Sequence, residues 1–247
     1  MRILLTNDDG IDSPGIHALA VALRDMADVV IFAPVEERSG ASHSLTLGRP
    51  VGYRELDPGA GTPGFVIDGT PVDCVRLAVD AFNDPFDLVV SGINSGANVG
   101  LNVHYSGTVA AALEAAFIGR MGLAVSIATR NPRNLETAAM LGAEMAGLML
   151  DAGEEMVLNL NVPDLPENGL RGTLVTRLST SEEETALAMN SNCSENLCEL
   201  EDGKTVIDSR AVASGYVSVT PLALDLTAYG RLDLIKGWNW RPDGKKI

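Results

Sequence analysis

Two adjacent carboxylates, Asp8 and Asp9, come directly after a short apolar run at the start of the chain and just before Gly10. Neighbouring side chains of a strand point to opposite faces, so these carboxylates converge only where the strand ends and the backbone turns. Gly10 makes that turn easy because glycine adopts positive φ angles without steric cost. Two carboxylates held close together share either a proton or a cation. Oxygen-bearing residues in later loops favour the cation over simple helix capping, a role for which Ser13 is better placed.

Two polar loops after later strands offer further ligands for such a cation, Ser39 and Asn94. A site built from oxygen atoms alone favours one Mg²⁺ or Mn²⁺ ion over zinc, which usually recruits histidine or cysteine. On the residues alone, Ser39 and Asn94 suit an equally simple role, which is to hydrogen-bond the backbone of their own loops.

Three consecutive residues, Ser106, Gly107 and Thr108, precede an alanine-rich run with strong helix propensity. The start of a helix presents unpaired amides and the positive end of the helix dipole, which together suit a phosphate group. The same three residues also suit a plain helix cap. The pattern therefore indicates a phosphate site only if the cation site lies nearby.

Two histidines, His43 and His104, lie in or beside these loops and are candidates for a general acid that protonates a leaving alkoxide. Loop histidines also commonly have solvated or structural roles. His17 is expected on the first helix, away from the site. Asp8 is the preferred group to assist an attacking water, and direct attack by a carboxylate is the alternative.

The elements that position these residues alternate between strands and helices over the first part of the chain. Buried strands are expected near residues 2–6, 29–33, 86–90, 123–127 and 156–160, and helices near 14–26, 71–82, 109–117 and 135–150. Residues 91–100 are expected to lack regular structure because of their glycines. The alternation predicts a doubly wound α/β domain with a largely parallel sheet, in which ligands bind at the carboxyl ends of the strands.

The pattern changes after residue 166, so we expect a catalytic domain over residues 1–166 and a C-terminal extension over 167–247. The extension has an acidic arm at about 179–204, a strand at about 216–220 and a helix between Thr227 and Trp238.

Composition excludes several classes of function. The chain has 247 residues, 46% hydrophobic content and a formal net charge of −15, which repels the backbone of a nucleic-acid polymer. A stretch as long and apolar as a membrane span is absent from the sequence, as is an export signal, which predicts a cytoplasmic protein without membrane attachment. The three cysteines are expected to be reduced, and Cys193 with Cys198 is a weak candidate for zinc.

The chain resembles the SurE (survival protein E) family of metal-dependent 5′/3′-nucleotidases. The resemblance rests on seven blocks in the expected order: Thr6–Gly10, Arg38–Ser42, Gly69–Val75, Val90–Asn98, Tyr105–Val109, Asn159–Pro163 and Gly215–Leu222.

The resemblance implies a Rossmann-like, three-layer α/β/α fold in which Asp8, Asp9, Ser39 and Asn94 hold one divalent cation per subunit. It also implies that Asn98 and the segment Ser106–Thr108 face the substrate phosphate. The expected reaction converts nucleoside 5′- and 3′-monophosphates to nucleoside and phosphate, and short polyphosphate is a further substrate. Family members exchange C-terminal segments to form homodimers and often homotetramers. Residues 179–204 depart from the family pattern, which leaves subunit exchange, tetramer formation and base preference open.

Two alternatives remain at this point. Metal-dependent deacetylases of small glycans also place paired aspartates after a first strand, although they bring histidine to a zinc ion. A non-catalytic nucleotide sensor would use the same cleft, although two added carboxylates give a pure phosphate binder little benefit without a metal.

Overall fold

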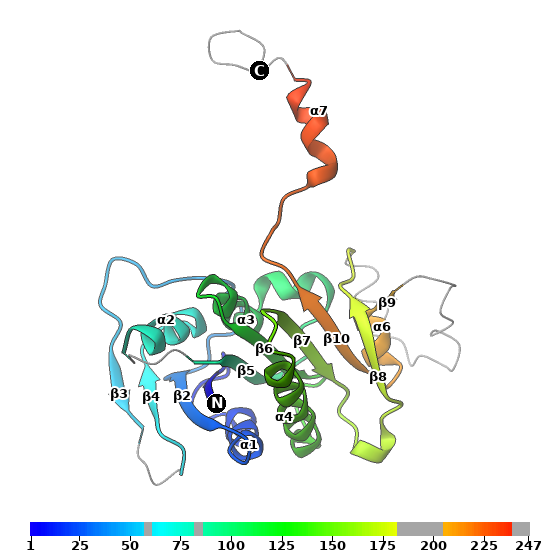
Figure 1. Cartoon of the computed structure of the whole chain (residues 1–247). Coiled ribbons are helices and arrows are strands. Elements are labelled where there is room, and N and C mark those ends of the chain that lie inside the picture. The colour runs from blue at the N-terminus through cyan, green and yellow to red at the C-terminus, as the bar shows by residue number, and fades with distance from the viewer. Residues whose placement is uncertain (57–60, 82–85, 182–204, 239–247) are drawn as a thin grey trace.

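The computed structural model describes residues 1–56, 61–81, 86–181 and 205–238, and a ten-stranded sheet runs through these parts of the chain (Figure 1). The strand order is β3-β4-β2-β1-β5-β6-β7-β10-β8-β9. The central strand β1 (Arg2–Thr6) lies between β2 (Asp28–Pro34) and β5 (Leu88–Ser95). The remaining strands are β3 (Tyr53–Glu55), β4 (Gly64–Ile67), β6 (Met121–Ile127), β7 (Val157–Val162), β8 (Thr173–Arg177), β9 (Val206–Ile207) and β10 (Val217–Leu222).

The described sheet is parallel at every pairing except two. At one edge β3 runs antiparallel to β4, and β10 enters antiparallel to β7, with Val219 opposite Leu160. In the core, β1 pairs in parallel with β2 on one side and with β5 on the other. The chain therefore adds strands first on one side of β1 and then on the other, which makes β1 the topological switch point of the sheet.

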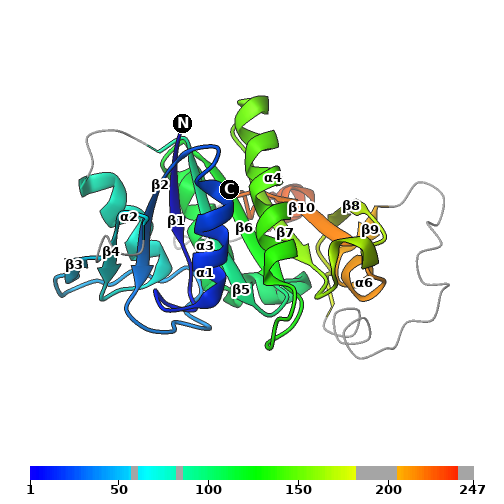
Figure 2. The same ribbon diagram turned by 90° about the horizontal axis from the view of Figure 1, so that it is seen from below.

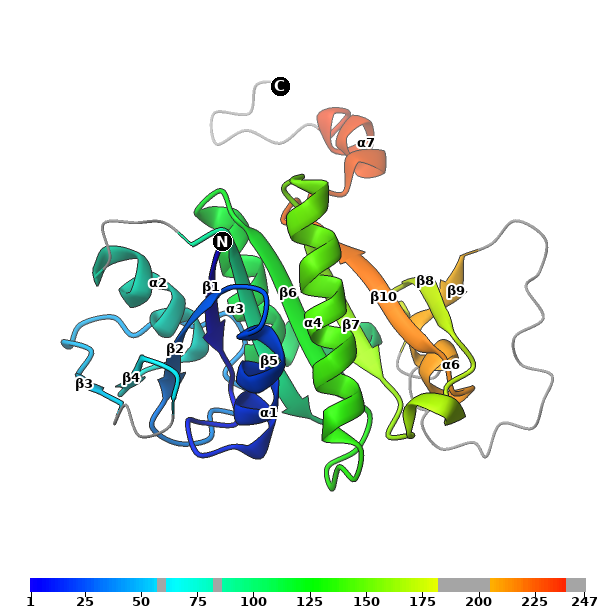
Figure 3. The same ribbon diagram turned by 60° about the horizontal axis from the view of Figure 1, so that its bottom comes forward.

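Helices cover both faces of the sheet and create the predicted three layers. One face carries α1 (Pro14–Leu23) and α4 (Leu135–Ala152), which lie side by side in Figure 2 and Figure 3. The other face carries α2 (Pro71–Ala81) and α3 (Gly107–Phe117).

The apolar residues of β1 pack alternately into the two cores on either face of the sheet. Ile3 and Leu5 pack into the core beneath α1 and α4, whereas Leu4 packs into the core beneath α2 and α3. Strands covered on both faces have no need of an alternating polar side, which is the pattern typical of parallel sheets.

The prediction that residues 91–100 lack regular structure is wrong for the first half of that segment. Strand β5 continues to Ser95 and pairs with β6 up to Ile127, with an irregularity in register between Ser91 and Asn94. Gly92 makes this possible, because a Cβ atom there would lie 2.3 Å from the carbonyl oxygen of Val125. The 3₁₀ helix η2 (Gly100–Tyr105) then leads into α3.

Helix α1 begins as predicted, with the Ser13 side chain accepting a hydrogen bond from the Gly15 amide at 3.3 Å. It ends at Leu23 and not near residue 26. The amide of Met26 instead donates to the Leu23 carbonyl, in a turn that returns the chain to β2.

The C-terminal part contains more regular structure than predicted. Strands β8 and β9, helix α6 (Asp208–Ala213) and the 3₁₀ helix η3 (Glu167–Gly169) were not expected, whereas β10 matches the predicted strand. The 3₁₀ helix η4 (Tyr229–Arg231) and α7 (Leu232–Lys236) match the predicted C-terminal helix. Most of the acidic arm, with Cys193 and Cys198, lies outside the described residues.

Helix α7 stands away from the body of the molecule in Figure 1. Among the described helices, none is both long enough and apolar enough to cross a bilayer.

Candidate active site

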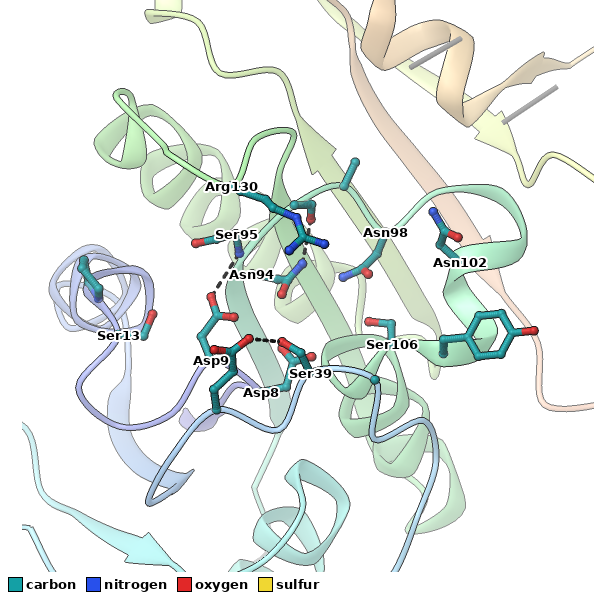
Figure 4. A pocket seen from close by; sticks show the side chains of 16 residues that line it. Asp8, Asp9, Ser13, Ser39, Asn94, Ser95, Asn98, Asn102, Ser106 and Arg130 are labelled. Atoms are coloured by element: carbon teal, nitrogen blue, oxygen red, sulfur yellow. Dashed lines mark hydrogen bonds between the residues drawn. The ribbon is translucent and has the colours of Figure 1, made fainter. Parts of the chain in front are cut away.

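A cavity of about 640 Å³ lies at the carboxyl ends of the central strands, beside β1, where the strand order switches sides. Open α/β sheets bind ligands at this kind of crevice. Figure 4 shows the labelled side chains around it. The lining includes six residues that the sequence singles out: Asp8, Asp9, Ser39, Asn94, Asn98 and Ser106.

The turn after β1 directs both aspartates toward this cavity. Gly10 has a φ angle of +92°, and a Cβ atom there would lie 3.0 Å from the backbone carbon of Glu36. The side-chain amide of Asn7 closes the turn by donating to the Gly10 carbonyl at 2.8 Å. Glycine is therefore needed both for its backbone conformation and for the close approach of the loop after β2.

Asp8 is almost completely enclosed, with 4% of its surface exposed. The Thr108 hydroxyl donates a hydrogen bond to Asp8 Oδ1. Gly107 lies so close that an added Cβ atom would be 2.9 Å from Asp8 Cβ. Burial raises the pKa of Asp8 above its ordinary value and the neighbouring Asp9 adds to this, while the Thr108 hydrogen bond opposes it. The carboxylate is thus held in a fixed orientation but forms no ion pair with a lysine, arginine or histidine among the described residues.

Asp9 lies beside Asp8 and is anchored to the end of β5. The Ser95 amide donates to Asp9 Oδ2 at 3.1 Å. Burial raises the pKa of Asp9, the hydrogen bonds with Ser95 oppose the rise, and the charge of Glu37 adds to it. Two desolvated, adjacent acids are favoured in their charged form when a cation lies between them. The pair therefore fits a bound cation, which would favour the charged form of both carboxylates.

Ser39 and Asn94 bring neutral oxygen atoms to the same cavity. The Ser39 hydroxyl donates to Glu37 Oε1 at 2.6 Å. The side-chain nitrogen of Asn94 donates to the Gly96 carbonyl at 2.7 Å, which fixes the orientation of its amide oxygen. No group of three or more histidine, cysteine or acidic side chains in the described chain could hold a metal ion. The donor set at the cavity is two carboxylates with neutral oxygens, which suits Mg²⁺ or Mn²⁺ better than zinc.

Asn98 is held by a buried polar network at the ends of β6 and β7. The backbone amide of Asn98 donates to Asn161 Oδ1 at 2.8 Å. Its backbone carbonyl accepts from Asn159 Nδ2 at 2.8 Å and from Asn161 Nδ2 at 3.1 Å. Its own side-chain nitrogen donates to the Ser126 hydroxyl at 2.9 Å. Asn159, Asn161 and Ser126 are inaccessible to solvent, so the network fixes the position of Asn98 at the cavity wall.

The first turn of α3 serves the site in two ways. The Ser106 side chain lines the cavity and caps the helix by accepting from the Val109 amide at 3.1 Å. Gly107 and Thr108 contact Asp8 directly and are not part of the cavity lining. The positive end of the helix therefore points at the carboxylate.

The two candidate histidines line a neighbouring apolar cavity of about 320 Å³, which shares Ser106 with the first. His43 Nε2 lies 2.6 Å from Oε2 of the buried Glu114, which also forms an ion pair with Arg76. His104 is exposed on η2, and His17 is exposed on α1.

Sequence reasoning missed several residues that line the first cavity, among them Glu37, Asn102, Tyr105 and Arg130. Arg130 follows β6 by three residues, as Asp9 follows β1, so a search for polar side chains after every predicted strand would have found it. Glu37 lies in the same loop as Ser39 and could have been found in the same way.

The fold and this cavity define a doubly wound α/β protein with an oxygen-rich ligand site at its topological switch point. The family model described as Survival protein SurE matches residues 3–185. The chain belongs to the SurE family.

The chain is similar over nearly its whole length to proteins named 5′-nucleotidase SurE. The protein from Ectopseudomonas mendocina is 45% identical, with 96% of this chain and 98% of the relative covered. The protein from Legionella pneumophila is 42% identical, with 94% and 95% covered. The crystal structure of the SurE protein from Aquifex aeolicus superposes with a TM-score of 0.79 at 35% identity, covering 96% of this chain and 98% of the other.

Proposed function

We propose that the protein hydrolyses nucleoside 5′- and 3′-monophosphates to nucleoside and phosphate, with short polyphosphate as a further substrate. The observation that carries the proposal is the convergence of Asp8 and Asp9 in one cavity with Asn94 and the start of α3. The similarity to proteins named 5′-nucleotidase SurE supports the reaction on 5′-monophosphates. The 3′-nucleotides and polyphosphate follow from the family resemblance.

The reaction uses one divalent cation, Mg²⁺ or Mn²⁺, held by Asp8, Asp9, Ser39 and Asn94. When bound, such a cation polarises the phosphate and lowers the pKa of adjacent water. The support for this assignment is the donor set itself, because the two raised carboxylate pKa values and the neutral oxygens suit a hard cation.

The side chains of the protein bind and orient the reactants. Asp8, fixed by Thr108, orients the water whose oxygen bonds to phosphorus as the ester P–O bond breaks. Asn98 and Ser106 contact the phosphate from the cavity wall, and Gly107 and Thr108 direct the positive end of α3 toward the reacting charge. His43 or His104 donates the proton that the leaving nucleoside oxygen requires.

The protein forms a homodimer by exchange of its C-terminal segments, and a homotetramer is the larger form of the same assembly. The support is the exposed apolar surface beyond β10, where Leu226 is 85% exposed and Trp238 is 56% exposed. This surface belongs to the segment 223–238, which stands away from the body of the molecule in Figure 1. Residues 1–166 act as the catalytic part and 167–247 as the extension. We place the protein in the cytoplasm, where reduced thiols such as the unpaired Cys74 are usual.

The decisive experiment measures phosphate release from AMP, 3′-AMP and polyphosphate by protein stripped with a chelator, before and after Mg²⁺ or Mn²⁺ is restored. We expect activity only with metal. Asp8→Asn should lose activity and bind Mn²⁺ more weakly in a calorimetric titration. Asp12→Asn is the matched control, because Asp12 is exposed and lies outside the cavity lining.

Three outcomes would contradict the proposal. Full activity after stripping would exclude the metal mechanism. Hydrolysis of an N-acetyl glycan without phosphate release would indicate a deacetylase. Binding of AMP that is unaffected by chelation, with no phosphate released under any condition, would indicate a nucleotide sensor.

A further inference from the structure

Arg130 brings a positive charge to the active-site cavity from the loop after β6. Its side chain is exposed to solvent and belongs to the cavity lining. Figure 4 shows its guanidinium group pointing into the cavity, toward Asn94 and Asn98. Both of those residues belong to the proposed cation and phosphate sites, so Arg130 faces the region where a substrate phosphate would lie.

Arg130 differs in charge from the other ionisable residues around the cavity. The described lining contains three acidic residues, Asp8, Asp9 and Glu37, and Arg130 is its single basic residue. The chain as a whole carries a formal charge of −15. A phosphate monoester is itself an anion, so it needs a local source of positive potential to enter this cavity.

Two other arginines are already paired, whereas Arg130 has no partner among the described residues. Arg38 forms ion pairs with Glu36 at 3.2 Å and with Asp68 at 3.5 Å. Arg76 pairs with the buried Glu114. In the part of the chain that the structure describes, Arg130 has neither an ion pair nor a hydrogen bond through its side chain. Its guanidinium donors therefore remain available for a ligand.

We infer that Arg130 is a substrate-binding residue that contacts the phosphate oxygens of the nucleotide. A guanidinium group is planar and donates two parallel hydrogen bonds, a geometry that matches two oxygens of one phosphate. The contact neutralises phosphate charge from the side of β6, while the cation site at Asp8 and Asp9 does so from the side of β1. This inference rests on the proposed function, since it assigns a further group to the same substrate.

The ordinary alternative is that Arg130 is an exposed loop arginine with no role in binding. Arg133 provides the comparison, because it is also exposed, lies in the same loop and is outside the cavity lining. Arg130→Gln and Arg133→Gln make the same change in net charge. A general electrostatic effect would alter both variants equally, whereas a phosphate contact would alter only the first.

The test compares wild type, Arg130→Gln, Arg130→Lys and Arg133→Gln. We expect Arg130→Gln to raise the KM for AMP and the dissociation constant of inorganic phosphate by about ten-fold, the usual loss for one charge-assisted contact. Arg130→Lys should recover part of the affinity because it keeps the charge without the planar pair of donors. Arg133→Gln should behave as wild type. Calorimetric titration with Mn²⁺ should give the same affinity for all four proteins, which separates phosphate binding from metal binding.

The outcomes distinguish this inference from the proposed function. An active wild type whose Arg130→Gln variant keeps the same KM and phosphate affinity would overturn the inference and leave the function standing. An equal loss in Arg130→Gln and Arg133→Gln would also overturn it. If the wild type releases no phosphate, but Arg130→Gln alone binds inorganic phosphate more weakly than the wild type does, the proposed reaction would be overturned. Arg130 would then remain an anion-binding residue.

Discussion

The Thr108 hydroxyl, in the first turn of α3, donates a hydrogen bond to Asp8 Oδ1 just beyond the end of β1. The two residues are 100 positions apart in the sequence, and both side chains are shielded from solvent. The hydrogen bond joins the central strand to the helix whose N-terminus faces the cavity. The orientation of the Asp8 carboxylate therefore depends on how α3 packs against the sheet.

Loss of the Thr108 hydroxyl should reduce catalysis, because the Asp8 carboxylate would lose the hydrogen bond that fixes its orientation. Thr108→Val keeps the shape of the side chain but leaves Asp8 Oδ1 without its donor. A hydrogen bond to a charged group contributes about 1.5–3 kcal/mol, so we expect kcat/KM for AMP to fall by about ten- to a hundred-fold. Steady-state kinetics at saturating Mg²⁺ provide the measurement.

Thr108→Ser is the matched variant because it retains the hydroxyl and loses only a methyl group. It should keep most of the activity. Equal losses in Thr108→Val and Thr108→Ser would show that packing of the methyl group matters and the hydrogen bond does not. Circular dichroism of both variants tests whether the fold is intact.

The sequence predicts the part of the site that lies directly after a strand. The apolar run predicts a strand, and Asp8, Asp9 and Gly10 directly after it predict the end of the strand and the turn. All three features are set by neighbouring residues. The same reasoning predicts the Pro14 start of α1 and a cap of α3 at Ser106 or Thr108, of which Ser106 is the cap. These features could be predicted because each depends on residues within a few positions.

The remaining features depend on contacts between distant segments. Gly92 continues β5 because the Val125 backbone lies against it, and nothing near Gly92 in the sequence reveals that neighbour. Asn159 and Asn161 appear as polar interruptions of a buried strand, although their spacing places both on one face, where they hold Asn98. Strand β8 pairs with β10, and β9 pairs with β8, so their existence depends on the order of the whole sheet edge.

Replacing apolar residues in the segment 223–238 should break the proposed dimer. Leu226 is 85% exposed and Leu234 is 55% exposed, so neither contributes to the core of a single chain. The double variant Leu226→Glu with Leu234→Glu should lower the molar mass measured by light scattering from that of a dimer or tetramer to that of a monomer. Burying a carboxylate in an apolar interface is unfavourable, which is the reason for the expected dissociation.

The control for this change is Leu47→Glu, since Leu47 is also 85% exposed but lies in the loop before β3. It should leave the molar mass unchanged. A wild-type chain that is monomeric at every concentration would contradict the proposed exchange, and so would a double variant with the mass of wild type.

Asp73 should make stability depend on pH in the acid range. Its carboxylate accepts hydrogen bonds from the Thr46 amide at 2.9 Å, the Thr46 hydroxyl at 2.6 Å and the Thr70 amide at 2.8 Å. Burial alone would raise the pKa of Asp73, but these hydrogen bonds outweigh burial and lower it below the ordinary value of 3.8. Since the folded state binds its proton less readily than the unfolded state, the stabilisation is fully present above pH 3.8 and is lost as pH falls through the lowered value.

Urea unfolding of wild type and Asp73→Asn at several pH values tests this. At neutral pH the variant should be less stable by about 1–2 kcal/mol, because a neutral amide is a weaker and less complete acceptor. The difference should shrink as the pH falls below 3.8 toward the lowered pKa, at which Asp73 of the folded wild type becomes protonated. Asp80→Asn, an exposed position on the same helix, should show no such convergence. A constant difference between wild type and Asp73→Asn at all pH values would contradict the prediction.

The leaving group offers the sharpest test of the two candidate general acids. The oxygen of a nucleoside leaves poorly without a proton, whereas p-nitrophenolate leaves readily as an anion, so a general acid matters for AMP and little for p-nitrophenyl phosphate. We expect one of His43→Ala and His104→Ala to slow AMP hydrolysis by about a hundred-fold or more and to change p-nitrophenyl phosphate hydrolysis far less. The other histidine variant then serves as the control. Equal losses on both substrates would indicate damage to the shared wall at Ser106, and unchanged rates in both variants would mean that neither histidine supplies the proton.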